Sequence, residues 1–243
     1  MALTNLDGGR LVAERNSDSP QLLALHGWGR DRTDFAKALQ GYPYLAVDLP
    51  GFGLSVAPDS AWGSLEYAKA IRPVLSAFDV PPVVVAHSFG GRVAIQAAAT
   101  LNLPLRGLVL TGVPLVRTTA RPRRSPVGYR LTKALYQAGL VSDDRIGTAR
   151  RRYGSADYRN AEGIMREVLV RCVNEDYEPL LGEIRCPVDL VWAVGDLEAP
   201  LAGAQEAERL IPHARLTVVP GGDHFSALRE PSALRAAIDR LLA

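Results

Sequence analysis

One stretch of the sequence decides the fold: Val83-Val84-Val85-Ala86-His87-Ser88-Phe89-Gly90-Gly91-Arg92. It opens with a β-branched run that is too short for a helix and predicts a strand, whereas the alanine-rich residues 93–99 that follow favour a helix. The two glycines after Ser88 allow a sharp turn between these elements. This strand–turn–helix layout is typical of a nucleophile elbow, in which a strained turn presents a serine hydroxyl clear of the sheet.

The elbow motif departs from the usual pattern at one position. In place of G-x-S-x-G the chain has Ala86 at the first glycine, the smallest available substitute. Because a bare x-x-S-x-G pattern is weak, Ser88 alone could equally be a serine in an ordinary strand-to-helix loop. Its assignment as a nucleophile therefore depends on the partners that the rest of the chain provides.

The composition is that of one globular domain with an insertion, since the chain has 243 residues of which 47% are hydrophobic. No apolar run approaches the ~18 residues of a membrane span, and Asp7 and Arg10 stand where a signal peptide would carry its apolar region. We therefore expect a cytoplasmic protein without an integral membrane segment. Cys172 and Cys186 are expected to be free thiols, because one falls in a helical stripe and the other just before a strand. No feature of the sequence indicates the oligomeric state.

Strands and helices alternate along most of the chain. The two segments 9–14 and 21–25, separated by turn formers at 16–20, predict an antiparallel start. The remaining strands are predicted at 44–47, 83–87, 105–111, 188–194 and 216–219, and helices at 31–39, 65–78, 93–99, 201–210 and 232–242. This rhythm predicts an α/β fold, with a mostly parallel sheet covered by helices on both faces.

The rhythm is interrupted between residues 115 and 184, where no clear strand occurs. Apolar residues from Ile164 to Val173 recur there at helical spacing, which we interpret as core packing. The segment 117–152 is strongly basic, with ten Lys and Arg against two Asp. We therefore predict a core formed by residues 1–114 and 185–243 and a helical insertion at 115–184.

A serine nucleophile needs a base, and four histidines are available. In a parallel sheet, sites form where loops leave the carboxyl ends of the strands. His213 precedes its strand and is expected to be an exposed loop residue. His87 neighbours Ser88, but the tight turn should point its ring away, and His26 opens a glycine loop early in the chain. His224, which follows a strand in a glycine-containing loop, is the predicted base.

The base needs a carboxylate that orients its ring, and this group should also follow a strand. Asp196 does so, with Glu198 in the same loop as the fallback. Asp189 lies inside its strand, and Asp223 is poorly placed to bond the ring of its neighbour His224. The order Ser88, Asp196, His224, with each member after a strand, predicts a catalytic triad.

Attack on a carbonyl also needs donors for the oxyanion. The backbone N–H of Phe89 is the first expected donor, because it follows Ser88 at the start of a helix. The second is expected from His26-Gly27-Trp28-Gly29, as the N–H of Trp28. The alternative for this loop is a purely structural turn between strand and helix.

The motif series resembles that of the α/β-hydrolase superfamily. The resemblance is carried by the His26 loop and by Asp48-Leu49-Pro50-Gly51-Phe52-Gly53, His87-Ser88-Phe89-Gly90-Gly91, Gly195-Asp196 and Asp223-His224-Phe225. It covers nearly the whole chain outside residues 115–184, which in that family correspond to a helical cap, so that substrate selection by this segment is implied. Besides Ala86, a second departure is Asp223, where a glycine often precedes the histidine.

These residues predict a serine hydrolase that cleaves an ester, thioester or amide of a small molecule through an acyl-enzyme, with no cofactor and no metal ion. A carbon–carbon bond hydrolase or synthase-like lyase of the same superfamily, and a non-catalytic binding protein on the same fold, are the alternatives. The basic segment, with Arg121, Arg123 and Arg124, suggests an anionic substrate or an acidic partner. Solvated surface arginines are an equal interpretation, and nucleic acid is not expected as a partner.

Overall fold

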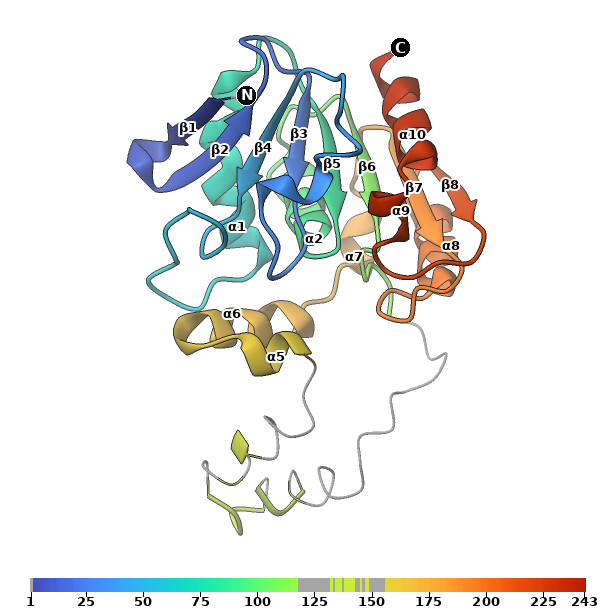
Figure 1. Cartoon of the computed structure of the whole chain (residues 1–243). Coiled ribbons are helices and arrows are strands. Elements are labelled where there is room, and N and C mark those ends of the chain that lie inside the picture. Colours follow the sequence, from blue (N-terminus) through green and yellow to red (C-terminus); the bar gives the residue numbers. More distant parts are fainter. Residues whose placement is uncertain are drawn as a thin grey trace.

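The computed structural model describes residues 2–117 and 156–243, together with positions 132, 134–136, 138–142, 145, 147 and 148. These residues form one eight-stranded sheet (Figure 1). The strands are β1 (Ala2–Leu6), β2 (Leu11–Arg15), β3 (Leu22–Leu25), β4 (Tyr44–Asp48), β5 (Val83–His87), β6 (Gly107–Thr111), β7 (Val188–Ala193) and β8 (Ala214–Val219), in the spatial order β1-β2-β4-β3-β5-β6-β7-β8. From β4 across to β8 all neighbours pair in parallel, and only β1 and β2 are antiparallel to their neighbours. The predicted α/β fold is confirmed.

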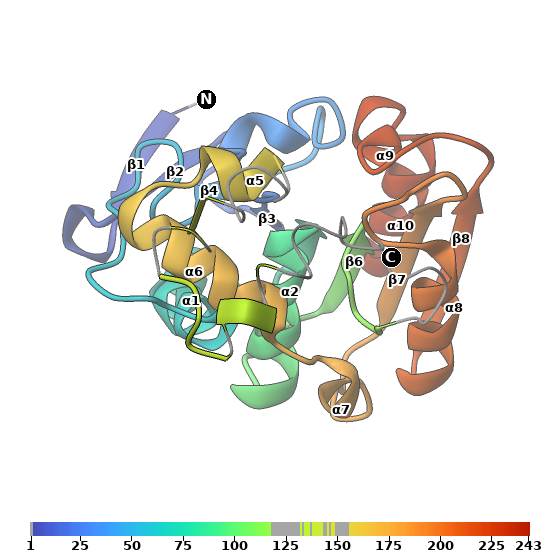
Figure 2. The same ribbon diagram turned by 90° about the horizontal axis from the view of Figure 1, so that it is seen from below.

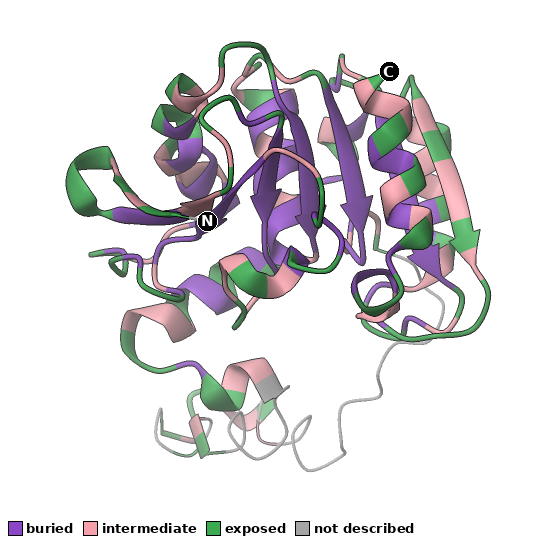
Figure 3. Ribbon diagram, turned by 45° about the horizontal axis from the view of Figure 1, so that its top comes forward, coloured by how far each residue is buried: buried purple, intermediate pink, exposed green. Residues whose placement is uncertain are grey.

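Both faces of the central strands are buried (Figure 3). Successive side chains of a strand point to opposite faces, so Val84 and Ala86 of β5 pack in one core, and Val83 and Val85 in the other. The first core is closed by α1 (Ser64–Ile71), α2 (Phe89–Ile95), α7 (Glu178–Leu181) and α8 (Leu201–Leu210). The second is closed by a 3₁₀ helix at Arg32–Phe35 and by α9 (Ser226–Arg229) and α10 (Ser232–Leu242).

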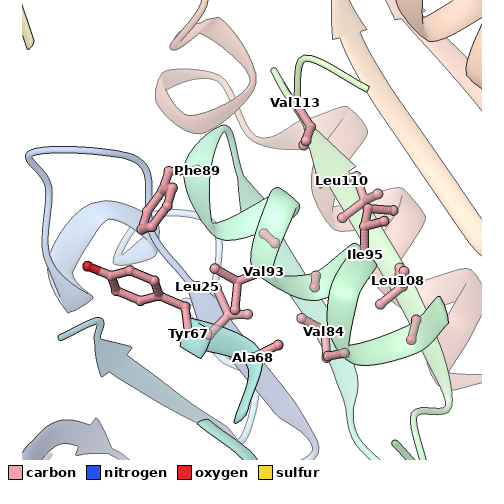
Figure 4. Close-up of a cluster of buried hydrophobic side chains, with 14 of the residues drawn as sticks. Leu25, Tyr67, Ala68, Val84, Phe89, Val93, Ile95, Leu108, Leu110 and Val113 are labelled. Carbon is pink, nitrogen blue, oxygen red and sulfur yellow. The ribbon is translucent and has the colours of Figure 1, made fainter. Parts of the chain in front are cut away.

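The packing of α2 fixes the position of the elbow. Its side chains meet those of β5 and β6 in the first core, and the ring of Tyr67 meets Phe89 edge-on at a centroid distance of 4.9 Å (Figure 4). A Cβ at Gly90 would collide with the backbone of Leu25, and one at Gly91 with the side chain of Val113. The helix therefore lies as close to the strands as two glycines permit.

The strand pairing predicted at the start of the chain was wrong. The segments 9–14 and 21–25 do not pair with each other, because β2 pairs with β1 and β4. All four residues of β3 are buried, which suits a strand with parallel neighbours on both sides, whereas the half-exposed end of β2 suits an outer position. The strand β1 was not predicted.

Two predicted helices are shorter than expected. The helix expected at 31–39 is reduced to a 3₁₀ helix at Arg32–Phe35. The helix expected at 65–78 is α-helical only in α1 and continues as a 3₁₀ helix at Arg72–Ala77, where Pro73 lacks the N–H that an α-helical bond needs.

The chain between β6 and β7 contains helices joined by loops, and no strand, where it is described. It contains α5 (Ala156–Asn160), α6 (Gly163–Asn174) and α7. Figures 1 and 2 show α5 and α6 lying across the edge of the sheet where the parallel strands end. The division into a core and an insertion at residues 115–184 stays a prediction, and Arg121, Arg123 and Arg124 lie outside the described residues. Within the described residues, no helix combines the length and apolar character that crossing a membrane requires.

Candidate active site

The carboxyl ends of β3, β5, β7 and β8 bring the predicted site residues to one edge of the sheet. A cavity of about 760 Å³ opens there. Four of the five predicted site residues, Trp28, Ser88, Phe89 and His224, line it together with Glu198, and the fifth, Asp196, is hydrogen-bonded to His224. The residues that the sequence separates by almost two hundred positions are therefore neighbours.

Ser88 has the strained backbone of an elbow. Its φ of 47° and ψ of −109° lie outside the regions that residues with a side chain normally adopt. The turn is held because the N–H of Ser88 donates to the carbonyl of Thr111 at 3.0 Å, and its own carbonyl accepts from Gly91 at 3.1 Å. The side chain of Ala86 packs in the first core, so the missing glycine leaves the turn intact.

His224 and Asp196 form a buried pair. The Nδ1 of His224 lies 2.9 Å from the Oδ2 of Asp196, and since a carboxylate accepts, Nδ1 carries the hydrogen and Nε2 is left free for chemistry. The other oxygen of Asp196 accepts from the N–H groups of Glu198 at 2.9 Å and Ala199 at 2.8 Å, which fixes the carboxylate. Burial lowers the pKa of His224, but the hydrogen bond and charge of Asp196 outweigh it, and the pKa is raised.

Glu198 occupies a different place at the same ring. Its Oε2 lies 3.8 Å from the Nε2 of His224, and its side chain is more than half exposed. Asp196 therefore contacts the nitrogen that orients the ring, and Glu198 approaches the nitrogen that would exchange protons. Among the described residues, Ser88 makes no hydrogen bond to His224, an arrangement common in sites that tighten only around substrate.

The two residues that carry the expected oxyanion donors are in contact through their rings. The ring of Trp28 packs edge-on against Phe89 at a centroid distance of 5.2 Å. Neither backbone N–H donates to another described residue, so both are free to bind an oxyanion. The loop that carries Trp28 is held by His26, whose Nδ1 donates to the carbonyl of Gly27 at 2.7 Å and whose Nε2 accepts from the N–H of Leu49 at 2.9 Å.

The other histidines and aspartates considered as base or orienting carboxylate have structural contacts instead. Burial lowers the pKa of His26, which suits its role as a neutral link between two loops. His213 is exposed before β8. Asp189 pairs with Arg240 at 2.7 Å inside β7. Asp223 accepts from the N–H of Phe225 at 3.0 Å, and its bond to Arg229 lowers its pKa to about 2.

Sequence reasoning missed two residues of this region. Asp34 lies beside His87 and contacts the N–H of Gly27 in the loop of Trp28. It was not singled out because residues 31–39 were interpreted as an ordinary helix. Gly112 has a φ of +62°, and a Cβ there would lie 2.9 Å from the His224 ring. The glycine directly after a predicted strand was the available signal for Gly112.

The two cysteines are free thiols, and the part of the chain that the structure describes contains no cluster of metal ligands. Cys172 and Cys186 are free, and burial raises the pKa of the Cys172 thiol to about 12, which excludes a thiolate at neutral pH. In the described ranges, no group of three His, Cys, Asp or Glu side chains could hold a metal ion.

The chain is similar to several known hydrolases. An esterase of Xanthomonas oryzae pv. oryzae, named pimeloyl-[acyl-carrier protein] methyl ester esterase, is 30% identical over 92% of this chain and 95% of its own. A 2-(acetamidomethylene)succinate hydrolase of Mesorhizobium japonicum is 25% identical over 98% of this chain and 94% of its own. The solved structure of an esterase from Exiguobacterium antarcticum superimposes with a TM-score of 0.73 at 18% identity, covering 99% of both chains. Residues 22–237 match the model of the alpha/beta hydrolase family. The chain belongs to the alpha/beta hydrolase family.

Proposed function

We propose that the chain is a serine hydrolase that cleaves a carboxylic ester, thioester or amide of a small molecule through an acyl-enzyme. The observation that carries the proposal is the shared cavity. Ser88 stands in a positive-φ turn at its wall, and His224, held by Asp196 at 2.9 Å, lines the same space. Family membership alone would also suit a protein without turnover, so the proposal depends on these three side chains.

The mechanism follows from which atoms are free. Ser88 Oγ attacks the carbonyl carbon while His224 Nε2 accepts the hydroxyl proton, and Asp196 stabilises the imidazolium through Nδ1. The negative charge that develops on the carbonyl oxygen is stabilised by the N–H groups of Trp28 and Phe89. His224 then gives its proton to the departing oxygen, sulfur or nitrogen. A water molecule, deprotonated by His224 in the same way, releases the acid and restores Ser88.

An ester is the first substrate class to test. The relative from Xanthomonas oryzae is named for a methyl ester. The relative from Mesorhizobium japonicum is named as the hydrolase of an acetamidomethylene compound, which makes amides the second class.

Residues 115–184 are proposed to form the cap that selects the substrate. Leu169, Cys172 and Val173 of α6 line the cavity opposite the sheet edge. Two arginines hold the end of this helix: Arg92 donates to the carbonyl of Cys172, and Arg117 to that of Asn174 at 2.7 Å. The helix is therefore a fixed wall of the cavity where it is described.

The charge of the preferred substrate is a separate question. Of the cavity residues in the described ranges, Arg92 and Arg117 are engaged with backbone carbonyls, whereas Asp157 and Glu198 lie near His224. The expectation of an anionic substrate therefore depends on Arg121, Arg123 and Arg124, which are outside the described residues.

A serine-directed fluorophosphonate tests the proposal directly. We expect the protein to be labelled and the S88A variant not to be, with turnover of the variant lower by several orders of magnitude, on the order of the ~10⁶ lost from other serine triads. Absence of labelling would leave the non-catalytic binding protein. A panel of esters, thioesters and amides beside β-diketones separates the proposed activity from a carbon–carbon bond hydrolase. Neutral, anionic and cationic esters of equal size, compared as salt is raised, test the charge preference.

A further inference from the structure

The ring of His87 is enclosed by three loops of the site. It is almost fully buried and contacts the loop after β3 through Gly27, the loop after β6 through Gly112 and the loop after β8 through His224. These loops carry an oxyanion donor, the support of the elbow and the base, respectively. His87, the neighbour of Ser88 in the sequence, therefore contacts all three loops that must be aligned with the nucleophile.

The first contact joins His87 to the base. The Nε2 of His87 lies 3.2 Å from the backbone carbonyl of His224. Because a carbonyl only accepts, Nε2 carries a hydrogen and donates. The two imidazole rings are also packed, with centroids 4.8 Å apart, and the ring of Phe225 lies 5.2 Å from His87.

The second contact joins His87 to the oxyanion loop through Asp34. The Nδ1 of His87 lies 3.6 Å from Oδ2 of Asp34, whose carboxylate is completely shielded from solvent. Nδ1 has no hydrogen-bond partner among the described residues, so the two groups attract each other as an ion pair when both ring nitrogens carry hydrogens. The same Oδ2 accepts from the N–H of Gly27 at 3.4 Å, next to Trp28, and Oδ1 accepts from Nε of Arg30 at 2.7 Å. Burial raises the pKa of Asp34, but the neighbouring His87 and Arg30 outweigh it and the pKa is lowered, so the carboxylate is charged.

The glycines around the ring show how closely it is fitted. A Cβ on Gly27 would lie 2.7 Å from Nδ1 of His87, and a Cβ on Gly112 would lie 3.2 Å from its Nε2. Real Cβ atoms essentially never show a contact as short as the first, and the second is tighter than nine in ten of them, so both loops approach the ring closely because they lack a side chain. This observation is independent of the hydrogen bonds and points to the same alignment.

We propose that His87, supported by Asp34, is a positioning residue that sets the distance between the oxyanion loop and the base. The inference rests on the proposed serine hydrolase function and assigns a role to a side chain that borders the cavity and packs against the ring of His224. Misplacing reacting groups by about 1 Å can cost ~10²-fold in rate, so loss of the ring should lower kcat far more than it changes KM.

Three substitutions of His87 distinguish the contribution of Nε2 from that of Nδ1. H87Q can place an amide N–H where Nε2 donates, H87N can place one only near Nδ1, and H87L removes both. We expect H87Q to keep most of kcat and of the fluorophosphonate labelling rate, and H87N and H87L to lose on the order of ~10²-fold in both, with KM within about threefold. H213Q, at the exposed histidine before β8, is the matched control and should behave as the unmodified protein.

The pH profile distinguishes positioning from a general loss of folding. The charged groups that face His224 in the described residues are Asp196, Glu198 and Asp157, and the raised pKa of the base depends on them. If H87L loosens the His224 loop, contact with Asp196 weakens and the acid limb of kcat/KM moves to lower pH. H87Q should leave the limb in place. Circular dichroism and thermal unfolding identify a temperature at which all variants are folded.

A double variant tests whether Asp34 acts through His87. D34N should lower kcat by no more than H87Q does, since both remove only the Nδ1 end of the connection, and D34N combined with H87L should lose no more than H87L alone. Equal labelling and turnover in H87N, H87L and the unmodified protein, or equal loss in H87Q and H87L, would overturn the inference. Failure of the proposed function is distinct, because the unmodified protein would then not be labelled at all.

Discussion

The Nδ1 of His224 lies 2.9 Å from the Oδ2 of Asp196, and both side chains are almost completely buried. Two backbone N–H groups hold the second oxygen of this carboxylate, so its direction is fixed before any substrate arrives. The two carboxylates of the loop after β7 therefore lie at different nitrogens of the His224 ring, Asp196 at Nδ1 and Glu198 at Nε2. Glu198, 3.8 Å from Nε2 and largely exposed, has no comparable support.

The first prediction compares these two carboxylates. D196N should lower kcat/KM by roughly 10⁴-fold, because the amide can present its N–H to Nδ1 and so favour the wrong tautomer. E198Q should lower it by less than about tenfold, since an exposed charge at this distance interacts weakly. Steady-state kinetics with one ester measures both. Similar losses in the two variants would show that Asp196 is not the orienting carboxylate.

The second prediction concerns pH. A general base must be neutral, so kcat/KM should rise with pH through the pKa of His224, and that pKa is raised above the ordinary value of 6.5. Activity should therefore be lost as pH falls through a midpoint above 6.5. The charges of Asp196, Glu198 and Asp157 all raise the pKa of His224. E198Q removes one of these charges, so the acid limb of kcat/KM for this variant should move to lower pH. A limb that stays in place, or moves to higher pH, would contradict the assignment of His224 and Glu198.

How far the sequence predicts this molecule depends on the range of the interactions involved. The elbow at Ser88 and the buried strands were recognisable because their signals are local: β-branched runs, turn formers and glycines within a few residues. The pairing of β2 with β4 was not recognisable, because it joins segments about thirty residues apart and no local signal distinguishes β4 from β3 as the partner. The helix predicted at residues 31–39 was too long for the same reason. Asp34 contacts Gly27 and His87, and these contacts cannot be read from a helical periodicity.

The site shows the same division. The order of Ser88, Asp196 and His224 and their places after strands could be predicted, because parallel strands bring their carboxyl ends together. The hydrogen bond from His87 to the His224 carbonyl could not, as it depends on side-chain directions inside a buried turn. Nor did the basic composition of residues 117–152 reveal that Arg117 caps a helix end rather than facing the cavity freely.

The third prediction uses two glycines that differ in surroundings. At Gly112, φ is +62° and a Cβ would lie 2.9 Å from the His224 ring, so G112A should displace the base and lower kcat by about 10²-fold. Gly182 has a φ of −68° and nothing within 4 Å of an added Cβ. G182A should leave kcat unchanged and stabilise the fold by up to ~1 kcal/mol. Kinetics and thermal unfolding of the pair are the measurement, and unchanged kcat in G112A would mean that the ring has room to move.

The last prediction concerns the attachment of α6 to the core. Arg92 of α2 donates to the carbonyl of Cys172 near the end of α6, and its guanidinium lies 5.6 Å from the centre of the Tyr177 ring. R92A removes this charged donor and leaves the carbonyl with the N–H of Glu175, at 3.3 Å, at a cost of ~1–2 kcal/mol. Since about 1 kcal/mol lowers Tm by roughly 2–4 °C in a chain of this size, a decrease of several degrees is expected.

The same substitution should loosen one wall of the cavity. Because Cys172 and Val173 line it, KM for esters should rise in R92A while labelling of Ser88 by a small fluorophosphonate, which needs only the elbow and base, stays within a few-fold. R209A is the matched control. This arginine is exposed and, within the described ranges, pairs with Glu206 of its own helix, a surface pair worth at most ~1 kcal/mol. A Tm and KM in R92A equal to those of R209A would mean that α6 is held on the core without Arg92.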